Sequence, residues 1–247
     1  MLRFDNVSFA YEDNIKILNS LSFSVDNQES LAIVGPNGAG KTTLMKAILG
    51  LVEADGNISL DNNEVSKSNL SLIRKEIGYV SQNSDAQLFM PTVLEDMIFG
   101  LMNYGKNQED AVAVAEKTLE ELDVSRLMNR RNSTLSSGEK RMVSIATVLA
   151  MEPTIMLLDE PSSNLDLHHR RILVNTLNKL DIGKIIATHD LDLVLETCDR
   201  VILLNEGRIV ADGPSLDILS NRKLLEENGL ELPLCIAGLP DRCKEQM

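Results

Sequence analysis

The stretch Gly35-Pro-Asn-Gly-Ala-Gly-Lys41-Thr42 decides the fold, because it fits the eight-position pattern of a loop that binds phosphate groups. It follows the apolar run Leu31-Ala-Ile-Val34, which predicts a buried strand, and it opens a helix predicted from about Thr42 to Val52. Glycines allow backbone amides to turn toward phosphate oxygens, and the helix N-terminus adds about half a positive charge. The pattern therefore predicts a nucleotide site in an α/β fold.

Two side chains of this loop carry the expected chemistry. Lys41 is expected to bridge the β- and γ-phosphates, and the Thr42 hydroxyl is expected to bind Mg²⁺. The predicted nucleotide-binding residues of the loop are Gly35, Pro36, Asn37, Gly38, Ala39, Gly40, Lys41, Thr42 and Thr43.

A second motif lies at the end of another predicted strand, Ile155-Met-Leu-Leu158, which runs into Asp159-Glu160-Pro161. Adjacent carboxylates standing alone more often mark a solvated turn. Here ligands are expected at the carboxyl ends of the parallel strands, where these residues stand. We therefore expect Asp159 to hold Mg²⁺ through water and Glu160 to polarise the attacking water.

Histidines occur at two places. His189 follows the apolar run Ile185-Ile-Ala-Thr188, at the same predicted edge of the sheet, and is expected to contact the γ-phosphate and the attacking water. His168 and His169 stand near the start of a helix beside two arginines, so we interpret them as surface residues without a role.

Strand-like and helix-like segments alternate along the chain, except in its middle. There, Val93, Met97 and Leu101 recur at helical spacing, and so do Val112, Ala115, Leu119 and Leu122. The acidic segment from Asn107 to Asp123 is interpreted as a solvated helix face. We infer an α/β core that is interrupted by a helical insertion between about residues 88 and 152.

Composition excludes several classes of function. The chain has 247 residues and a formal net charge of -13, which is the wrong sign for wrapping nucleic acid. Only 3% of the residues are aromatic, and none is Trp, which argues against a base-stacking surface. No apolar run reaches the roughly 18–20 residues of a membrane span, and no signal-peptide core is present. Cys198, Cys235 and Cys243 are interpreted as reduced thiols of a cytosolic protein, so any membrane role requires a partner.

With these residues in place, the chain resembles the ABC ATPases. Leu135-Ser-Ser-Gly-Glu-Lys140 is similar to the signature motif of that family, and it lies between the phosphate loop and Asp159. The other landmarks follow in order, and the resemblance covers about residues 2 to 225. These landmarks are Tyr11, Gln82, Ser162-Ser-Asn-Leu-Asp166 and Thr188-His189-Asp190.

The resemblance implies the P-loop NTPase fold of ABC ATPases, with a RecA-like core, an antiparallel β subdomain and the inserted helical subdomain. It places the ATPase domain at residues 1–225 and a C-terminal extension at 226–247. The implied cofactors are ATP and Mg²⁺, with Tyr11 stacking on adenine and Gln82 near the metal. Glu160 and His189 are the implied catalytic residues of ATP hydrolysis.

The resemblance also implies a dimer with a second ABC ATPase subunit, identical or related. In this arrangement Ser136, Ser137 and Gly138 of one subunit cap the ATP that is bound to the other. Two positions depart from the common signature: Ser137 replaces glycine and Glu139 replaces glutamine. We expect these departures to weaken closure of the dimer somewhat, because the carboxylate of Glu139 repels a triphosphate.

A narrower resemblance links the chain to the A components of energy-coupling-factor importers of the cobalt, nickel and vitamin type. It rests on Val80-Ser-Gln-Asn-Ser-Asp-Ala-Gln-Leu-Phe89 and on Pro91-Thr-Val-Leu-Glu-Asp96. It implies that a transmembrane T component docks near Asp85 and Gln87, and that the chain works peripherally at the cytoplasmic face of the membrane. Ser84 and Ala86 depart from that group's pattern. Two alternatives stay open: an ABC ATPase without a transporter, as in iron–sulfur assembly, and a nucleotide-gated binding module that hardly hydrolyses ATP.

Overall fold

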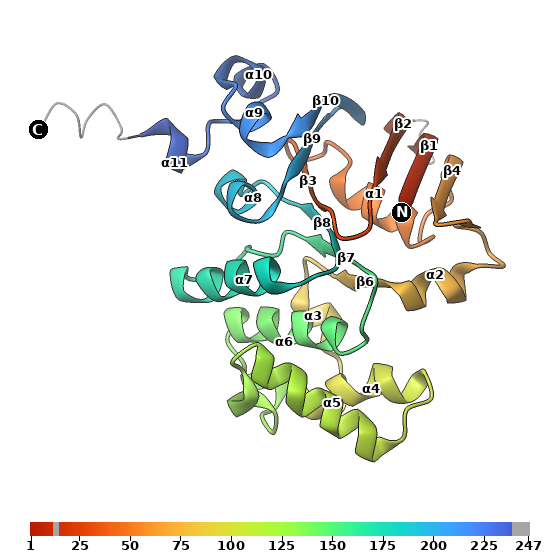
Figure 1. Cartoon of the computed structure of the whole chain (residues 1–247), viewed down its shortest axis with the longest axis vertical. Helices are drawn as coiled ribbons and strands as arrows, with labels where there is room; N and C mark the ends of the chain where they lie inside the picture. The colour runs from red at the N-terminus through yellow and green to blue at the C-terminus, as the bar shows by residue number, and fades with distance from the viewer. Residues whose placement is uncertain (12–14, 239–247) are drawn as a thin grey trace, which may run out of the picture.

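The computed structural model describes residues 1–11 and 15–238, and its larger sheet has six strands (Figure 1). The strands are β3 (Ser30–Val34), β6 (Ile77–Val80), β7 (Ile155–Asp159), β8 (Gly183–Ala187), β9 (Arg200–Asn205) and β10 (Arg208–Pro214). Their order is β10-β9-β3-β8-β7-β6. All neighbours pair in parallel except β10, which is antiparallel to β9.

The central strands are buried along their whole length, as their continuous apolar runs predict. Successive side chains point to opposite faces, so Leu31 and Ile33 join one core cluster while Ala32 and Val34 join the other. The sheet is thus covered on both faces. Because β3, β7 and β8 run in parallel, the segments that follow them meet at one edge of the sheet.

A second sheet is antiparallel and contains the N-terminal strands. It is formed by β1 (Leu2–Ala10), β2 (Lys16–Val25), β4 (Asp55–Leu60) and β5 (Asn63–Glu64), in the order β2-β1-β4-β5. Its apolar face shares a core with α1 (Lys41–Ile48), and α2 (Leu70–Glu76) leads into β6. The α/β fold is therefore confirmed.

The predicted helix after the phosphate loop ends earlier than expected. Helix α1 stops at Ile48, and the chain turns at Gly50, whose φ is +60°. Leu51 is consequently 57% exposed and does not share the buried face of Leu44 and Ile48.

The segment between β6 and β7 is helical. It comprises α3 (Ser84–Gln87), α4 (Val93–Asn103), α5 (Gln108–Glu121), the 3₁₀ turns η1 (Ser125–Leu127) and η2 (Asn132–Thr134), and α6 (Ser137–Leu149). Figure 1 shows α4, α5 and α6 together at one end of the molecule, beyond β6 and β7. The predicted face of Val93, Met97 and Leu101 is buried. On α5, Ala111 is fully buried, whereas Val112 is only half-buried, and the acidic residues are exposed as expected.

The remaining helices follow β7 and β8 or close the chain. They are α7 (Leu167–Lys179), α8 (Leu191–Thr197), α9 (Ser215–Leu219), α10 (Arg222–Glu227) and α11 (Leu234–Ala237). Within residues 1–11 and 15–238, none of the helices has the length and apolarity that a bilayer crossing requires. Cys198 is buried and Cys235 exposed, both as free thiols, while Cys243 and the end of the predicted C-terminal extension lie outside the described residues.

Candidate nucleotide-binding and catalytic site

The phosphate loop lies between β3 and α1, and two of its glycines are required by their surroundings. Gly35 has a φ of +155°, and a Cβ there would stand 2.0 Å from the carbonyl oxygen of Leu204. Gly40 has a φ of +107° and precedes the first residue of α1. A side chain at either position would displace neighbouring backbone or strain the turn. Glycine at these two positions therefore keeps the loop open for phosphate oxygens.

Backbone carbonyl groups of this loop hold the side chain of Lys41 in place. Its Nζ donates to the carbonyl oxygens of Gly35 at 2.7 Å and Pro36 at 3.2 Å, and the residue is buried. Burial lowers the pKa of Lys41, although the nearby carboxylates of Glu160 and Asp159 act in the opposite direction. A buried ammonium with two carbonyl partners is a preformed cation for the phosphates of a nucleotide.

The oxygen atoms predicted to bind Mg²⁺ lie together. The Thr42 hydroxyl donates to Oδ1 of Asp159 at 3.2 Å, and the Tyr79 hydroxyl donates to Oδ2 at 3.3 Å. Burial raises the pKa of Asp159, with a further contribution from Glu160, so a cation beside this carboxylate would favour its charged form.

This donor set fits magnesium in particular. Among residues 1–11 and 15–238, no group of three or more His, Cys, Asp and Glu side chains could hold a metal ion by itself. Mg²⁺ characteristically takes one or two protein ligands and completes its shell with phosphate oxygens and water. Thr42 and Asp159 are the side chains that this geometry offers to a metal ion bound with a nucleotide, and Gln82, which lines the same cavity as Thr42, stays a predicted ligand.

Glu160 is fixed from several directions. Its backbone N–H donates to the carbonyl of Ala187 at 2.8 Å, and its Oε2 accepts from the Thr188 hydroxyl at 3.1 Å. Nδ1 of His189 lies 2.8 Å from the same oxygen. Glu160 has a φ of +49°, an uncommon conformation for a residue with a side chain, and such strain persists where surrounding structure enforces it. These contacts fix one buried carboxylate at the carboxyl ends of β7 and β8.

One cavity of about 250 Å³ collects most of the predicted nucleotide-binding residues. Its lining is Tyr11, Ile17, Asn37, Gly38, Ala39, Gly40, Lys41, Thr42, Thr43, Gln82 and Glu160. Tyr11 is 50% exposed and packs edge-on against Phe9, with ring centroids 4.9 Å apart. An accessible ring beside the phosphate loop suits stacking on a base. Ile17 was not predicted, because an apolar residue in a strand carries no distinguishing signal.

The signature residues lie elsewhere. In the described part of the chain, Ser136, Ser137 and Gly138 do not line the cavity that contains Lys41. They begin α6, where Ser136 and Glu139 form a capping box that satisfies the backbone N–H groups of both residues. Glu139 is also paired with Arg126 at 2.6 Å and Arg130 at 3.6 Å. Its charge is therefore balanced by two arginines, which removes our physical reason for expecting it to repel a triphosphate.

His169 is less exposed than its interpretation as a surface residue implies. Its ring packs over the signature, since a Cβ on Gly138 would stand 3.1 Å from it, and its side chain is only 18% exposed. Nδ1 of His169 also lies 3.0 Å from the Asp166 carboxylate. Nearby, the Ser137 hydroxyl donates to the carbonyl of Asn164 at 3.2 Å. The signature and the segment 162–166 are thus joined within one chain. His168 is exposed, as expected.

Asp85 and Gln87 are engaged inside the molecule. Asp85 forms an ion pair with Lys140 of α6 while remaining 72% exposed. The Gln87 side chain accepts from the Ser81 N–H at 3.0 Å and donates to the Ser144 carbonyl at 2.9 Å. Gln87 therefore connects the loop after β6 to helix α6.

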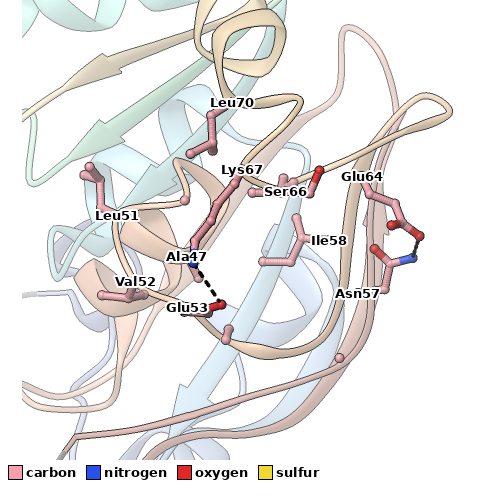
Figure 2. Close-up of a pocket in the computed structure, with 14 residues that line it drawn as sticks. Ala47, Leu51, Val52, Glu53, Asn57, Ile58, Glu64, Ser66, Lys67 and Leu70 are labelled. Carbon is pink, nitrogen blue, oxygen red and sulfur yellow. Dashed lines mark hydrogen bonds and ion pairs between the residues drawn. The ribbon is translucent and has the colours of Figure 1, made fainter.

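A separate cavity of about 500 Å³ lies at the far end of α1 from the phosphate loop (Figure 2). Figure 2 shows Leu51, Val52, Ile58 and Leu70 around it, with Lys67 reaching toward Glu53 at 3.7 Å. That ion pair is almost fully exposed and contributes little to stability. No predicted site residue lines this cavity among the described ones, so it is not the nucleotide site.

Several known proteins are similar to this chain over most of its length. The model of the family described as ABC transporter matches residues 18–163. The putative ABC transporter ATP-binding protein gll0289 of Gloeobacter violaceus is 43% identical over 235 residues, which cover 94% of this chain and 96% of that protein. The energy-coupling factor transporter ATP-binding protein EcfA of Carboxydothermus hydrogenoformans is 39% identical over 254 residues, covering 98% and 94%.

Among solved structures, the fold is similar to cbiO1 from Clostridium perfringens, which is described as part of the ABC transporter complex cbiONQ. The TM-score is 0.80 at 31% sequence identity, and the match covers 92% of this chain and 93% of that one. The similarity therefore extends over nearly the whole described chain.

Proposed function

Because the chain belongs to the ABC transporter family, whose ATPases couple hydrolysis of ATP to transport, we propose that it is the A component of an energy-coupling-factor importer. The observation that carries this proposal is the 39% identity to EcfA of Carboxydothermus hydrogenoformans across 98% of the chain. The similarity to cbiO1 supports the same type of transporter. The proposed cargo is a metal ion such as cobalt or nickel, or a vitamin, as in the importers that the sequence resembles.

The site residues divide the proposed reaction among themselves. Mg²⁺, when bound with ATP, neutralises charge that develops on the transferred phosphoryl group. Lys41 and the loop amides bind and orient the phosphates, and Thr42, Gln82 and Asp159 hold the metal. Glu160 orients and polarises the attacking water, and Thr188 and His189 hold its carboxylate in place. General-base catalysis by a positioned side chain contributes about 10²–10⁴-fold to a rate.

We further propose that two ATPase subunits complete each site, with the signature of one facing the nucleotide of the other. The separation of Ser136 from the cavity of Lys41 supports this arrangement, because the helix N-terminus at Ser136 otherwise has no phosphate to bind. Closure of the pair around ATP then transmits binding energy to a membrane partner.

The proposed docking surface for a transmembrane T component lies on the helical segment. A groove of about 400 Å³ is lined by Asp85, Leu88, Met90, Pro91, Asn132, Ser133 and Lys140. Phe89, between two of these residues, is 61% exposed, and it stacks edge-on against Phe99, which is 40% exposed. Asp96 holds this surface in place, since its Oδ1 accepts from the N–H groups of Phe89 and Met90. Exposed aromatic pairs beside a groove are typical of interaction sites.

Affinity purification from detergent-solubilised native membranes tests the proposal. The tagged chain should recover a multispan protein, identified by mass spectrometry, and Phe89→Ser should reduce its recovery about tenfold or more, as expected for an aromatic anchor. Leu216→Ser is the matched control, because Leu216 is 63% exposed on α9. Recovery of the chain without any membrane protein would contradict the importer and favour an ABC ATPase that works without a transporter.

The substrate class is tested separately by uptake into cells that lack the gene for this chain. Accumulation of labelled cobalt, nickel or biotin should depend on the intact chain, and a Glu160→Gln variant should not restore it. Restoration of uptake by that variant would show that hydrolysis at this site does not drive transport.

A further inference from the structure

Arg141 is a buried cation in the signature helix that the proposed mechanism does not use. It lies in the first turns of α6 and is only 2% exposed. Its Nη1 donates to the carbonyl of Ser81, and its Nη2 donates to the carbonyl of Gln82, each at 2.6 Å. The planar fork of the guanidinium therefore holds two successive peptide groups of the loop that follows β6.

The same loop is held from its other side. The Gln87 side chain accepts from the N–H of Ser81 and donates to the carbonyl of Ser144 in α6. The carbonyl of Ser81 is thus bound by Arg141 of α6. Its N–H is bound by Gln87, whose side chain also bonds to α6. Figure 1 shows α3, which follows this loop, close to α6.

Stability alone does not explain an arginine at this position. Removing a guanidinium from water costs several kcal/mol, and well-packed apolar residues often replace buried charges at no loss of stability. In the described structure the Nε atom of Arg141 also has no hydrogen-bond partner. Burial lowers the pKa of Arg141, although Asp159 and Glu160 act in the opposite direction. The two carbonyls are the main contacts that this buried cation makes.

The position of Arg141 links two functional segments. Gln82 lines the cavity of the phosphate loop, while Gly138 lies three residues before Arg141 on the same helix, about 4.5 Å along its axis. A small cavity of about 90 Å³ is lined by Gln82, Ser137, Arg141 and Asn164 among others, so the loop, the signature and the segment 162–166 meet there.

We propose that Arg141 is a positioning residue, which sets the place of Gln82 at the nucleotide site and ties it to the signature helix. The side chain of Gln82 is directed by its backbone, and that backbone is fixed by the guanidinium. Movement of α6 consequently moves Gln82. This inference rests on the proposed role of Gln82 and not on the importer or its cargo.

A double-mutant cycle tests it. Arg141→Met should lower kcat for ATP hydrolysis by about tenfold to a hundredfold, because small misplacements of a catalytic site have effects of this size, and should change KM less than twofold. Arg141→Lys, which cannot hold both carbonyls, should retain an intermediate kcat. Arg171→Met is the matched control, since Arg171 is 57% exposed and pairs with Glu196 on the surface.

The decisive comparison is made in a Gln82→Ala background. If Arg141 acts through Gln82, Arg141→Met should cause less than a twofold further loss of kcat there. Equal losses in both backgrounds would overturn the proposal, and so would a normal kcat for Arg141→Met beside an impaired Gln82→Ala. A normal kcat for Gln82→Ala itself would instead refute the proposed role of Gln82.

Hydrogen exchange gives a readout that does not depend on activity. Amides of residues 81–87 should exchange faster in Arg141→Met than in the unaltered chain, while those of β3 should not change. Unaltered exchange of residues 81–87 would contradict the positioning role. If Arg141→Met fails to fold, Arg141→Lys takes its place in both experiments, and the same outcomes support or overturn the proposal.

Discussion

Nδ1 of His189 lies 2.8 Å from Oε2 of Glu160, and the two residues come from the ends of neighbouring parallel strands. The Thr188 hydroxyl donates to the same oxygen, so one carboxylate oxygen is fully engaged and Oε1 is left for water. This arrangement assigns different tasks to the two residues. In the proposed mechanism Glu160 is the group that faces the reaction, and His189, which is exposed, orients it.

Replacing Glu160 with glutamine should nearly abolish hydrolysis while ATP still binds. Glutamine keeps the shape of the side chain but cannot accept a proton from water, and loss of a positioned base costs about 10²–10⁴-fold in rate. The check is steady-state ATPase activity together with fluorescence titration of a labelled nucleotide. Glu116→Gln, on the exposed face of α5, is the control and should retain full activity. An active Glu160→Gln enzyme would place the base elsewhere.

Replacing His189 should show whether its imidazole acts through Glu160. His189→Ala removes the imidazole from Oε2 and leaves the Thr188 hydroxyl as its side-chain partner, so we expect kcat to fall about tenfold, which is less than the loss expected on removal of the base itself. His189→Asn carries an amide nitrogen near the position of Nδ1 and should recover part of that loss. Unaltered activity of His189→Ala would show that this hydrogen bond does not matter for the rate.

Tyr79 should influence the affinity for Mg²⁺ through Asp159, which is a predicted metal ligand. Its hydroxyl donates to Oδ2 of Asp159 at 3.3 Å, and burial raises the pKa of Tyr79 to about 12, so it stays a donor throughout the working range of pH. Tyr79→Phe should weaken the apparent Mg²⁺ affinity by about tenfold. This is the lower end of the loss in metal affinity that follows when a hydrogen-bond partner of a metal ligand is removed.

The check for Tyr79 is ATPase activity over a series of free Mg²⁺ concentrations. At saturating Mg²⁺ the variant should approach the activity of the unaltered enzyme. Tyr104→Phe, at the end of α4 with a half-exposed ring, is the control. A loss of activity in Tyr79→Phe that excess Mg²⁺ does not correct would argue for a different role.

Much of the fold could be predicted because its signals are local. The apolar runs before Gly35, Asp159 and His189 identify three central strands, and their polar ends identify the edge where ligands gather. Parallel pairing then brings Thr42 and Asp159 to hydrogen-bond distance across 117 positions of sequence. Assignment of the family added the order of the motifs, from Tyr11 to His189.

Other relationships could not be predicted, because they depend on how helices dock. Tyr79 stands in the short strand β6, whose sequence does not show that the strand pairs with β7 or that the Tyr79 hydroxyl reaches Asp159. Arg141 follows Glu139 and Lys140, and a charged residue in such a run gives no sign of burial, yet it is buried under the loop of Gln82. His169 is near Gly138 only because α7 packs against α6. Such contacts join segments far apart in sequence, and no rule of residue spacing predicts them.

Glu139 should stabilise the start of α6 in a way that depends on pH. Hydrogen bonds from Arg126 and from the backbone of Ser136 lower the pKa of Glu139 to about 2 from its usual 4.5. A carboxyl group with a lowered pKa in the folded state stabilises that state above about pH 4.5, and the contribution is lost as the pH falls toward 2. Because Arg126 is 60% exposed and therefore screened by water, we expect only about 1 kcal/mol from the pair.

Thermal unfolding of Glu139→Gln measures this contribution. Glutamine can still form the capping box, so the variant removes the charge and keeps the cap. At pH 7 its Tm should lie about 2–4 °C below that of the unaltered chain. The gap should be constant down to about pH 5 and should shrink at lower pH, as the carboxyl group takes up its proton. Arg126→Gln should give a similar gap, because it breaks the same ion pair. A gap that is equally large at pH 3.5 and pH 7 would show that shape rather than charge makes Glu139 stabilising.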